Sequence, residues 1–198
     1  MQKYFFPFVL FLFSLAVILV QLDCAQEGEK TLTKDQLIAK GKYLVNLGGC
    51  NDCHSPKIMT NMGPVPDTTK LLSGHPADEP MPELDLKAPG INNWIHSSMD
   101  LTAWVGPWGV SFTANLTPDS STGLGAWSFQ DFLNTLRNGK HLGTGRAILP
   151  PMPWEPISHV DESDLKAIFT YLQSIPAINN RVPNPVPPNM LADYFKKK

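Results

Sequence analysis

The sequence predicts an all-α fold, because its apolar residues recur at helical spacing in three separate segments. These segments are residues 34–47, 129–138 and 162–174 of a chain of 198 residues. Residues 57–110 are rich in proline and glycine and show weak periodicity, which is typical of irregular structure. Since no change of composition marks a second domain there, we expect one domain with three core helices and a long Pro/Gly-rich excursion.

The first helix is expected from about Lys34 to Leu47. Thr33 is a suitable N-cap, and Gln36 three residues later completes a capping-box pattern. A Gly48-Gly49 pair then ends the helix. Its apolar stripe consists of Leu37, Gly41, Leu44 and Val45.

The second and third helices carry similar start and stop signals. Ser128 is the expected N-cap of the second helix, with Asp131 in its first turn and Gly139 just after its end. Asp161 is the expected N-cap of the third helix, and Pro176 follows its end. The two apolar stripes are Phe129, Phe132, Leu133 and Leu136, and Leu165, Ile168, Phe169 and Leu172.

The pentapeptide Cys50-Asn51-Asp52-Cys53-His54 directly follows the first helix and predicts covalent attachment of a c-type haem. Two cysteines at this spacing each form a thioether to one vinyl group of a single porphyrin. The histidine that follows is then placed as an axial ligand of the iron. A redox dithiol or a zinc site is the alternative. A zinc site needs a second ligand pair, however, and the only other cysteine is Cys24.

Met152 is the predicted second axial ligand. It lies in Leu149-Pro150-Pro151-Met152-Pro153-Trp154, between the second and third helices. Prolines restrict the backbone, so a thioether carried by this loop is held at a defined distance from the iron. His141 and His96 are the alternative ligands. The other methionines are expected to fill gaps in the core.

The N-terminus predicts export. An apolar run extends from Phe5 to Val20, so residues 1–25 are expected to be a signal peptide or an N-terminal anchor, preceding a domain of residues 26–198. Three fates remain open: cleavage near Ala25, lipidation at Cys24, or retention as a membrane anchor.

Charge and composition limit the other functions. The formal net charge is −2, which does not indicate a nucleic-acid binder. Residues 176–198 form a proline-rich C-terminal tail, of which Pro176 to Pro188 is expected to lie extended across the surface. Trp94, Trp104 and Trp108 are expected to hold the long excursion around the haem edge.

These motifs together resemble a class I c-type cytochrome over most of residues 33–175. More specifically, the chain resembles the haem modules of cytochrome c subunits of membrane-associated alcohol and sugar dehydrogenases, which typically carry several such modules. The segments that carry the resemblance are Gly106-Pro107-Trp108-Gly109, Asn115-Leu116-Thr117-Pro118-Asp119, Thr122-Gly123-Leu124-Gly125-Ala126-Trp127-Ser128 and the Met152 loop.

The resemblance implies a class I cytochrome c fold with three core helices around one covalently bound haem. The first and last helices are expected to cross near Gly41, Tyr43 and Tyr171. Cys50 and Cys53 are expected to carry the thioethers, with His54 and Met152 as the iron ligands.

Further expectations concern the surroundings of the haem. The carbonyl of Pro64 or Pro66 is expected to accept the ring N–H of His54. Trp127 and Arg146 are candidates to meet the haem propionates.

The function expected from these features is that of a monohaem electron-transfer protein in the periplasm or at its membrane surface, not an enzyme. Its partners would be redox proteins: a dehydrogenase, an oxidase or another cytochrome. The alternative within the same class is a haem-bearing subunit of a larger dehydrogenase or respiratory complex. If Met152 does not bind the iron, the open position favours a peroxidase or a gas sensor instead.

Overall fold

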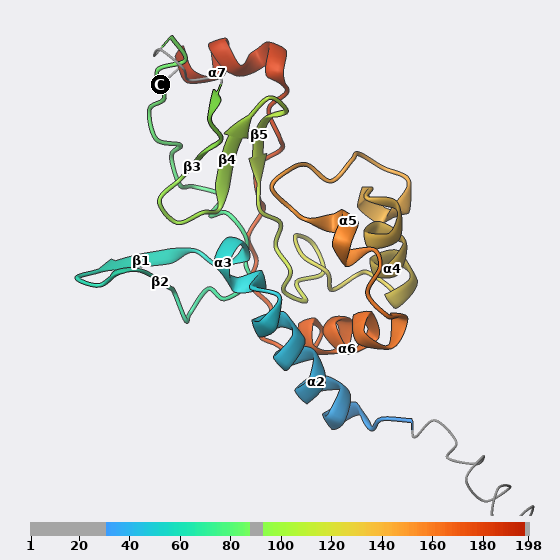
Figure 1. Cartoon of the computed structure of the whole chain (residues 1–198). Coiled ribbons are helices and arrows are strands. Elements are labelled where there is room, and N and C mark those ends of the chain that lie inside the picture. Colours follow the sequence, from blue (N-terminus) through green and yellow to red (C-terminus); the bar gives the residue numbers. More distant parts are fainter. Residues whose placement is uncertain (1–30, 88–92, 197–198) are drawn as a thin grey trace, which may run out of the picture. The chain divides into compact units, whose positions relative to one another are not determined.

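The three predicted helices are present at nearly the predicted positions in the computed structural model (Figure 1). They are α2 (Lys34–Leu47), α4 (Phe129–Asn138) and α6 (Glu162–Leu172). The structure describes residues 31–87 and 93–196. The signal peptide or anchor predicted for residues 1–25 lies outside this part of the chain. Among the described residues, no helix combines the length and the apolar character needed to cross a membrane.

Shorter helical segments connect or extend the three long helices. They are α3 (Cys50–His54), α5 (Trp154–Ile157), α7 (Leu191–Lys196) and the 3₁₀ turns η2 (His141–Gly143) and η3 (Pro188–Met190). Only α3 and α5 adjoin the predicted haem-binding residues, so these two short helices matter most for the site.

The ends of α4 form as the sequence predicts, whereas the start of α6 differs. The Ser128 hydroxyl accepts the N–H of Asp131, and the Asp131 carboxylate accepts the N–H of Ser128. Gly139 ends α4 with a left-handed φ of 61°. Asp161 stands at the N-cap of α6, but its side chain makes no capping hydrogen bond. Its backbone carbonyl instead accepts the N–H of Asp164 at 3.0 Å.

Helices α2 and α6 cross in close contact at Gly41. A Cβ atom at Gly41 would lie 2.0 Å from the carbonyl oxygen of Ala167 and 2.7 Å from the Cβ of Tyr171. The crossing predicted at Gly41 and Tyr171 is therefore confirmed. Tyr43 was also expected there, but its side chain is 63 % exposed.

One apolar cluster joins all three long helices. It also includes Leu72 from the excursion and Leu124 from the segment before α4, so the excursion is part of the core and not a separate layer. Its helical members are Val45, Phe132, Leu133, Leu136, Leu165 and Leu172. The rings of Phe132 and Phe169 lie 5.2 Å apart and tie α4 to α6.

The excursion contains two small antiparallel sheets, so the all-α expectation is not confirmed. The first sheet is the hairpin of β1 (Lys57–Thr60) and β2 (Gly63–Pro66). The second consists of β3 (His96–Ser97), β4 (Ala103–Gly106) and β5 (Gly109–Phe112), in that order. The strands are short and interrupted by glycine and proline, which hides the alternation that would have revealed them.

The C-terminal segment packs on the second sheet (Figure 1). Val186 pairs with Val110 of β5 through two backbone hydrogen bonds of 2.8 and 3.0 Å. Leu191, Tyr194 and Phe195 then contact an apolar cluster formed by Met81, Ala103, Val105 and Val110. Residues 176–187 contain no helix, in agreement with the predicted extended tail, whereas the η3 turn and α7 that follow were not predicted.

The three tryptophans of the excursion have unequal surroundings. Trp104 donates its ring N–H to the Leu101 carbonyl, and Trp108 donates to the Ser111 hydroxyl. Trp94 is 71 % exposed, so its part in holding the excursion around the haem edge stays a prediction.

Asn180 joins the C-terminal segment to the excursion. Its amide group donates to the carbonyls of Ser73 and His75 at 2.7 and 2.8 Å, and its side-chain oxygen accepts the N–H of Ala77 at 2.9 Å. One side chain thus satisfies three backbone groups of a loop that has no regular structure of its own.

We expect the Asn180→Ala variant to lose about 2 kcal/mol of unfolding free energy, because three hydrogen bonds are lost and backbone groups are left unpaired. Denaturant unfolding of the haem-loaded protein measures this loss. The control is Asn61→Ala, at an exposed residue of the β1–β2 turn. Equal stability of the two variants would show that Asn180 does not hold the loop.

Candidate haem-attachment site

The Cys-x-x-Cys-His motif forms its own short helix, α3, directly after α2. The N–H of Gly48 donates to the Leu44 carbonyl at 2.8 Å and closes α2. Gly49 then adopts a left-handed φ of 62°, and α3 begins at Cys50. The two glycines therefore redirect the chain between α2 and α3, as the sequence predicts.

His54 is held in the form that can bind a metal. Its ring is 9 % exposed, and Nδ1 lies 2.8 Å from the carbonyl oxygen of Ala114. A carbonyl only accepts hydrogen bonds, so Nδ1 carries the proton and the lone pair of the neutral ring is on Nε2. Burial lowers the pKa of His54, which favours the same neutral state.

The acceptor for His54 differs from the predicted one. Pro64 and Pro66 belong to β2 and pair with β1, whereas the observed acceptor is Ala114, sixty positions after His54. Backbone contacts bring these segments together: the N–H of Gly74 donates to the His54 carbonyl at 2.8 Å, and that of His75 to the Thr113 carbonyl at 3.0 Å.

The end of α3 is also fixed by side chains. The Ser55 hydroxyl donates to Asn51 and accepts the N–H of Leu72, both at 2.8 Å. Lys57 donates to the carbonyls of Asp52 and Asp100. The motif is therefore attached to the excursion on two sides and does not rely on α2 alone.

The two cysteines are half-buried thiols. Burial is the main cause that raises the pKa of both Cys50 and Cys53, so both are protonated at neutral pH. Cys50 also packs against the apolar cluster of the three long helices. Thioether formation at Cys50 would thus place an attached group against the core.

Met152 packs against the same apolar cluster as Cys50. The structure therefore brings one predicted thioether residue and the predicted second iron ligand to one core surface. The loop is held on both sides of Met152. Ser111 of β5 donates to the Pro150 carbonyl at 2.6 Å, and a Cβ at Gly139 would lie 2.6 Å from the Trp154 ring.

We expect the Ser111→Ala variant to lose about 1–2 kcal/mol of unfolding free energy, because the Pro150 carbonyl and the Trp108 ring N–H both lose a partner. Denaturant unfolding measures the loss, and Ser120→Ala, at an exposed hydroxyl, is the matched control. A result like that of the control would contradict the anchoring of this loop by β5.

Of the remaining predicted site residues, Trp127, His141 and Arg146 lie close together, whereas His96 lies elsewhere. The rings of Trp127 and His141 meet edge to face at 5.1 Å, and the N–H of His141 donates to the Arg146 carbonyl at 2.9 Å. Burial and the nearby Arg146 charge both lower the pKa of His141. His96 lies in β3, paired with Val105 of the second sheet.

The donor set fits a c-type haem. It offers two protonated thiols one helical turn apart and an imidazole with its lone pair on Nε2. The thioether of Met152 packs against the same apolar cluster as Cys50. These are the groups needed for two covalent links and two iron ligands.

Comparison with curated proteins agrees with this chemistry, although no protein-family model matches the chain. The gluconate 2-dehydrogenase cytochrome c subunit of Pantoea cypripedii is 27 % identical over 157 residues, which cover 79 % of this chain and 27 % of the relative. The fructose dehydrogenase cytochrome subunit of Gluconobacter japonicus is 29 % identical over 70 % of this chain and 22 % of the relative. The chain resembles cytochrome c subunits of dehydrogenases.

A third relative gives the same result. The cytochrome c subunit of alcohol dehydrogenase (quinone) from Gluconobacter oxydans is 28 % identical over 73 % of this chain and 25 % of the relative. The resemblance predicted from the sequence is therefore confirmed. This cytochrome-like chain spans about a quarter of the length of the curated relatives it matches.

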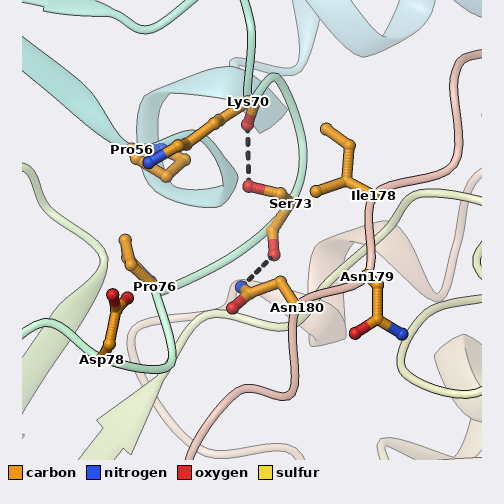
Figure 2. Close-up of a pocket in the computed structure, with 8 residues that line it drawn as sticks. All are labelled: Pro56, Lys70, Ser73, Pro76, Asp78, Ile178, Asn179 and Asn180. Atoms are coloured by element: carbon orange, nitrogen blue, oxygen red, sulfur yellow. Dashed lines mark hydrogen bonds between the residues drawn. The ribbon is translucent and has the colours of Figure 1, made fainter.

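The cytochrome-like chain also has a pocket of about 170 Å³ beside the haem motif (Figure 2). None of the four predicted haem-binding residues lines it, although Pro56 follows His54 by two positions. The lining residues are Pro56, Lys70, Ser73, Pro76, Asp78, Ile178, Asn179 and Asn180. The C-terminal segment lines one side of this pocket, where the amide of Asn180 reaches the Ser73 carbonyl.

Sequence reasoning missed the residues that support the site. Ala114 and Ser111 carry no chemical signal of their own, because a backbone carbonyl and a single serine occur everywhere. Their importance comes from contacts to His54 and Pro150, which lie far away along the chain.

Proposed function

We propose that residues 26–198 form a monohaem c-type cytochrome domain that transfers electrons and catalyses no bond-making reaction. The observation that carries the proposal is the hydrogen bond from His54 to Ala114, which leaves Nε2 of the motif histidine for a metal. The similarity to cytochrome c subunits supports it independently.

Each predicted site residue has a distinct task in this proposal. Cys50 and Cys53 form the two thioethers, and His54 and Met152 bind the iron. The haem supplies reversible one-electron chemistry at its iron. The protein fixes His54 through Ala114 and holds Met152 in a loop that β5 braces through Ser111. Both ligands then keep their positions when the charge of the iron changes, which favours fast electron transfer.

The potential follows from the same surroundings. A methionine sulfur favours ferrous iron and raises the reduction potential relative to a second nitrogen ligand. The apolar cluster that Met152 and Cys50 contact disfavours the additional charge of ferric iron. Both effects raise the reduction potential of the iron. The domain would therefore accept electrons from a donor of lower potential.

We also propose a dehydrogenase as the electron donor, with the domain acting outside the cytoplasm. The names of the relatives support a subunit of a dehydrogenase complex, since they are cytochrome subunits of gluconate, fructose and alcohol dehydrogenases. The apolar run of residues 5–20 supports export, because c-type haem is attached outside the cytoplasm in bacteria.

The test is expression with a bacterial haem-attachment system, followed by mass spectrometry under denaturing conditions. We expect one haem per chain that survives unfolding, and a spectrum of low-spin iron in both oxidation states. The Cys50→Ala and Cys53→Ala variants are expected to shift the reduced absorption bands, because one vinyl group then stays unsaturated. Loss of all haem on unfolding, or a high-spin spectrum that responds to carbon monoxide, would overturn the proposal.

A further inference from the structure

Three potential metal ligands meet at a place that contains none of the predicted haem-binding residues. They are His75, Glu79 and Asp100, and one ligand atom from each lies within 4.8 Å of the other two. His75 is 1 % exposed and Asp100 is 7 % exposed, whereas Glu79 reaches the surface. The first two ligands are therefore fixed in the interior, and the third offers a route from solvent.

The hydrogen bonds of Thr102 orient His75. The Thr102 hydroxyl donates its single proton to Oδ2 of Asp100 at 2.6 Å, and it lies 2.7 Å from Nδ1 of His75. The hydroxyl must accept from His75, so Nδ1 carries the proton and the lone pair of the neutral ring is on Nε2. Histidines that bind metals are commonly held in this way through their other nitrogen.

Hydrogen bonds hold the Asp100 carboxylate in place and favour its ionised form. Its Oδ1 accepts the Ser98 hydroxyl at 2.5 Å and the N–H of Thr102 at 3.2 Å. Burial alone would raise the pKa of Asp100, but the hydrogen bonds from Ser98 and Thr102, together with the nearby His75, lower it. Burial and the nearby Asp100 charge raise the pKa of Glu79, whereas the Lys70 charge opposes them. The carboxylates of Glu79 and Asp100 thus lie close together at a partly buried position, and a bound cation would reduce their repulsion.

We propose that His75, Glu79 and Asp100 bind a divalent cation of the zinc or manganese type. One imidazole nitrogen with two carboxylate oxygens suits these ions, whereas Ca²⁺ and Mg²⁺ prefer oxygen ligands alone. Metal–ligand bonds of about 2.1 Å allow ligand atoms at most about 4.2 Å apart. Ligand atoms as much as 4.8 Å apart would therefore have to move closer by a few tenths of an ångström, and water would fill the remaining positions.

The cation would tie the loop after the haem motif to the turn between β3 and β4. Glu79 and His75 lie on the loop, and Asp100 lies on the turn. The same loop donates the Gly74 N–H to the His54 carbonyl, and His75 bonds to the Thr113 carbonyl beside Ala114. Binding would therefore stabilise the segments that hold His54. The proposal does not depend on the proposed electron-transfer function.

The test is a titration of the chelator-treated, haem-loaded full chain with ZnCl₂ by isothermal calorimetry. We expect one Zn²⁺ per chain and a higher thermal unfolding temperature on binding. Glu79→Gln should weaken binding at least about tenfold, because an exposed ligand is lost without disturbing the buried hydrogen bonds. Asp100→Asn is the second ligand variant, and MnCl₂ followed by electron paramagnetic resonance is the second probe.

Glu83→Gln is the matched control, since it removes the same charge from an exposed residue outside the cluster. It should bind Zn²⁺ like the unmodified protein. Equal affinity of the Glu79 and Glu83 variants would mean adventitious surface binding and would overturn the proposal. Absence of binding would overturn it as well. The haem spectrum is recorded in every sample, so failure of haem binding is detected separately.

Discussion

Replacing Met152 with alanine is expected to leave the haem attached but to remove one axial ligand from its iron. The oxidised protein should lose the weak sulfur-to-iron absorption band and become high-spin. The reduction potential should fall by on the order of 0.1 V or more, within the range of about 0.8 V that axial ligands span. Absorption spectroscopy and a redox titration of the purified haem-loaded variant measure both effects.

Met62→Ala is the control for this experiment. Met62 is 98 % exposed in the β1–β2 turn, so its loss should change neither the spectrum nor the potential. If the Met152 variant keeps the sulfur band, another methionine is the ligand. Retention of the band would therefore contradict the assignment of Met152. If the variant loses the band but stays low-spin, a nitrogen ligand such as His141 has taken the vacated position, and the loss of the band still supports Met152.

The second large effect is expected for Gly41→Val. A Cβ at this position would lie closer to the Ala167 carbonyl and the Tyr171 Cβ than non-bonded atoms can approach. Helices α2 and α6 must therefore separate. Overpacking of this kind costs about 3 kcal/mol when the obstacle is backbone. We expect a loss of that size in the unfolding free energy of the haem-loaded protein, measured by denaturant unfolding.

The matched control is Ala39→Val, on the exposed side of the same helix. It introduces the same β-branched side chain, with its small loss of helix propensity, but meets no neighbouring helix. It should cost well under 1 kcal/mol. Similar losses in the two variants would show that the close crossing of α2 and α6 does not limit stability.

The helical part of the fold was predictable because its signals are local. Periodic apolar residues, Ser128 and the glycines after α2 and α4 act within a few residues, and helices formed where those signals lie. The haem motif is local for the same reason, since five consecutive residues carry it. Even Gly41, which contacts a helix far along the chain, was recognisable as a small residue in an apolar stripe.

The excursion was not predictable in this way. The strands between Lys57 and Phe112 have two to four residues each, too few for periodicity to be distinguished from chance. Their pairing depends on contacts such as Val110 with Val186, which join distant segments. The same limit explains the wrong acceptor for His54: the nearby prolines were considered, but the fold brings Ala114 instead.

The contact between His54 and Ala114 has one more consequence. The acceptor is a backbone carbonyl, so it is present whichever side chain stands at position 114. No single substitution there removes the hydrogen bond. A mutation can weaken it only by displacing the main chain, for example through the neighbouring pairing of Thr113 with His75. The orientation of this histidine is thus protected from point mutation at its direct partner, and sensitive positions should occur among residues that never touch the imidazole.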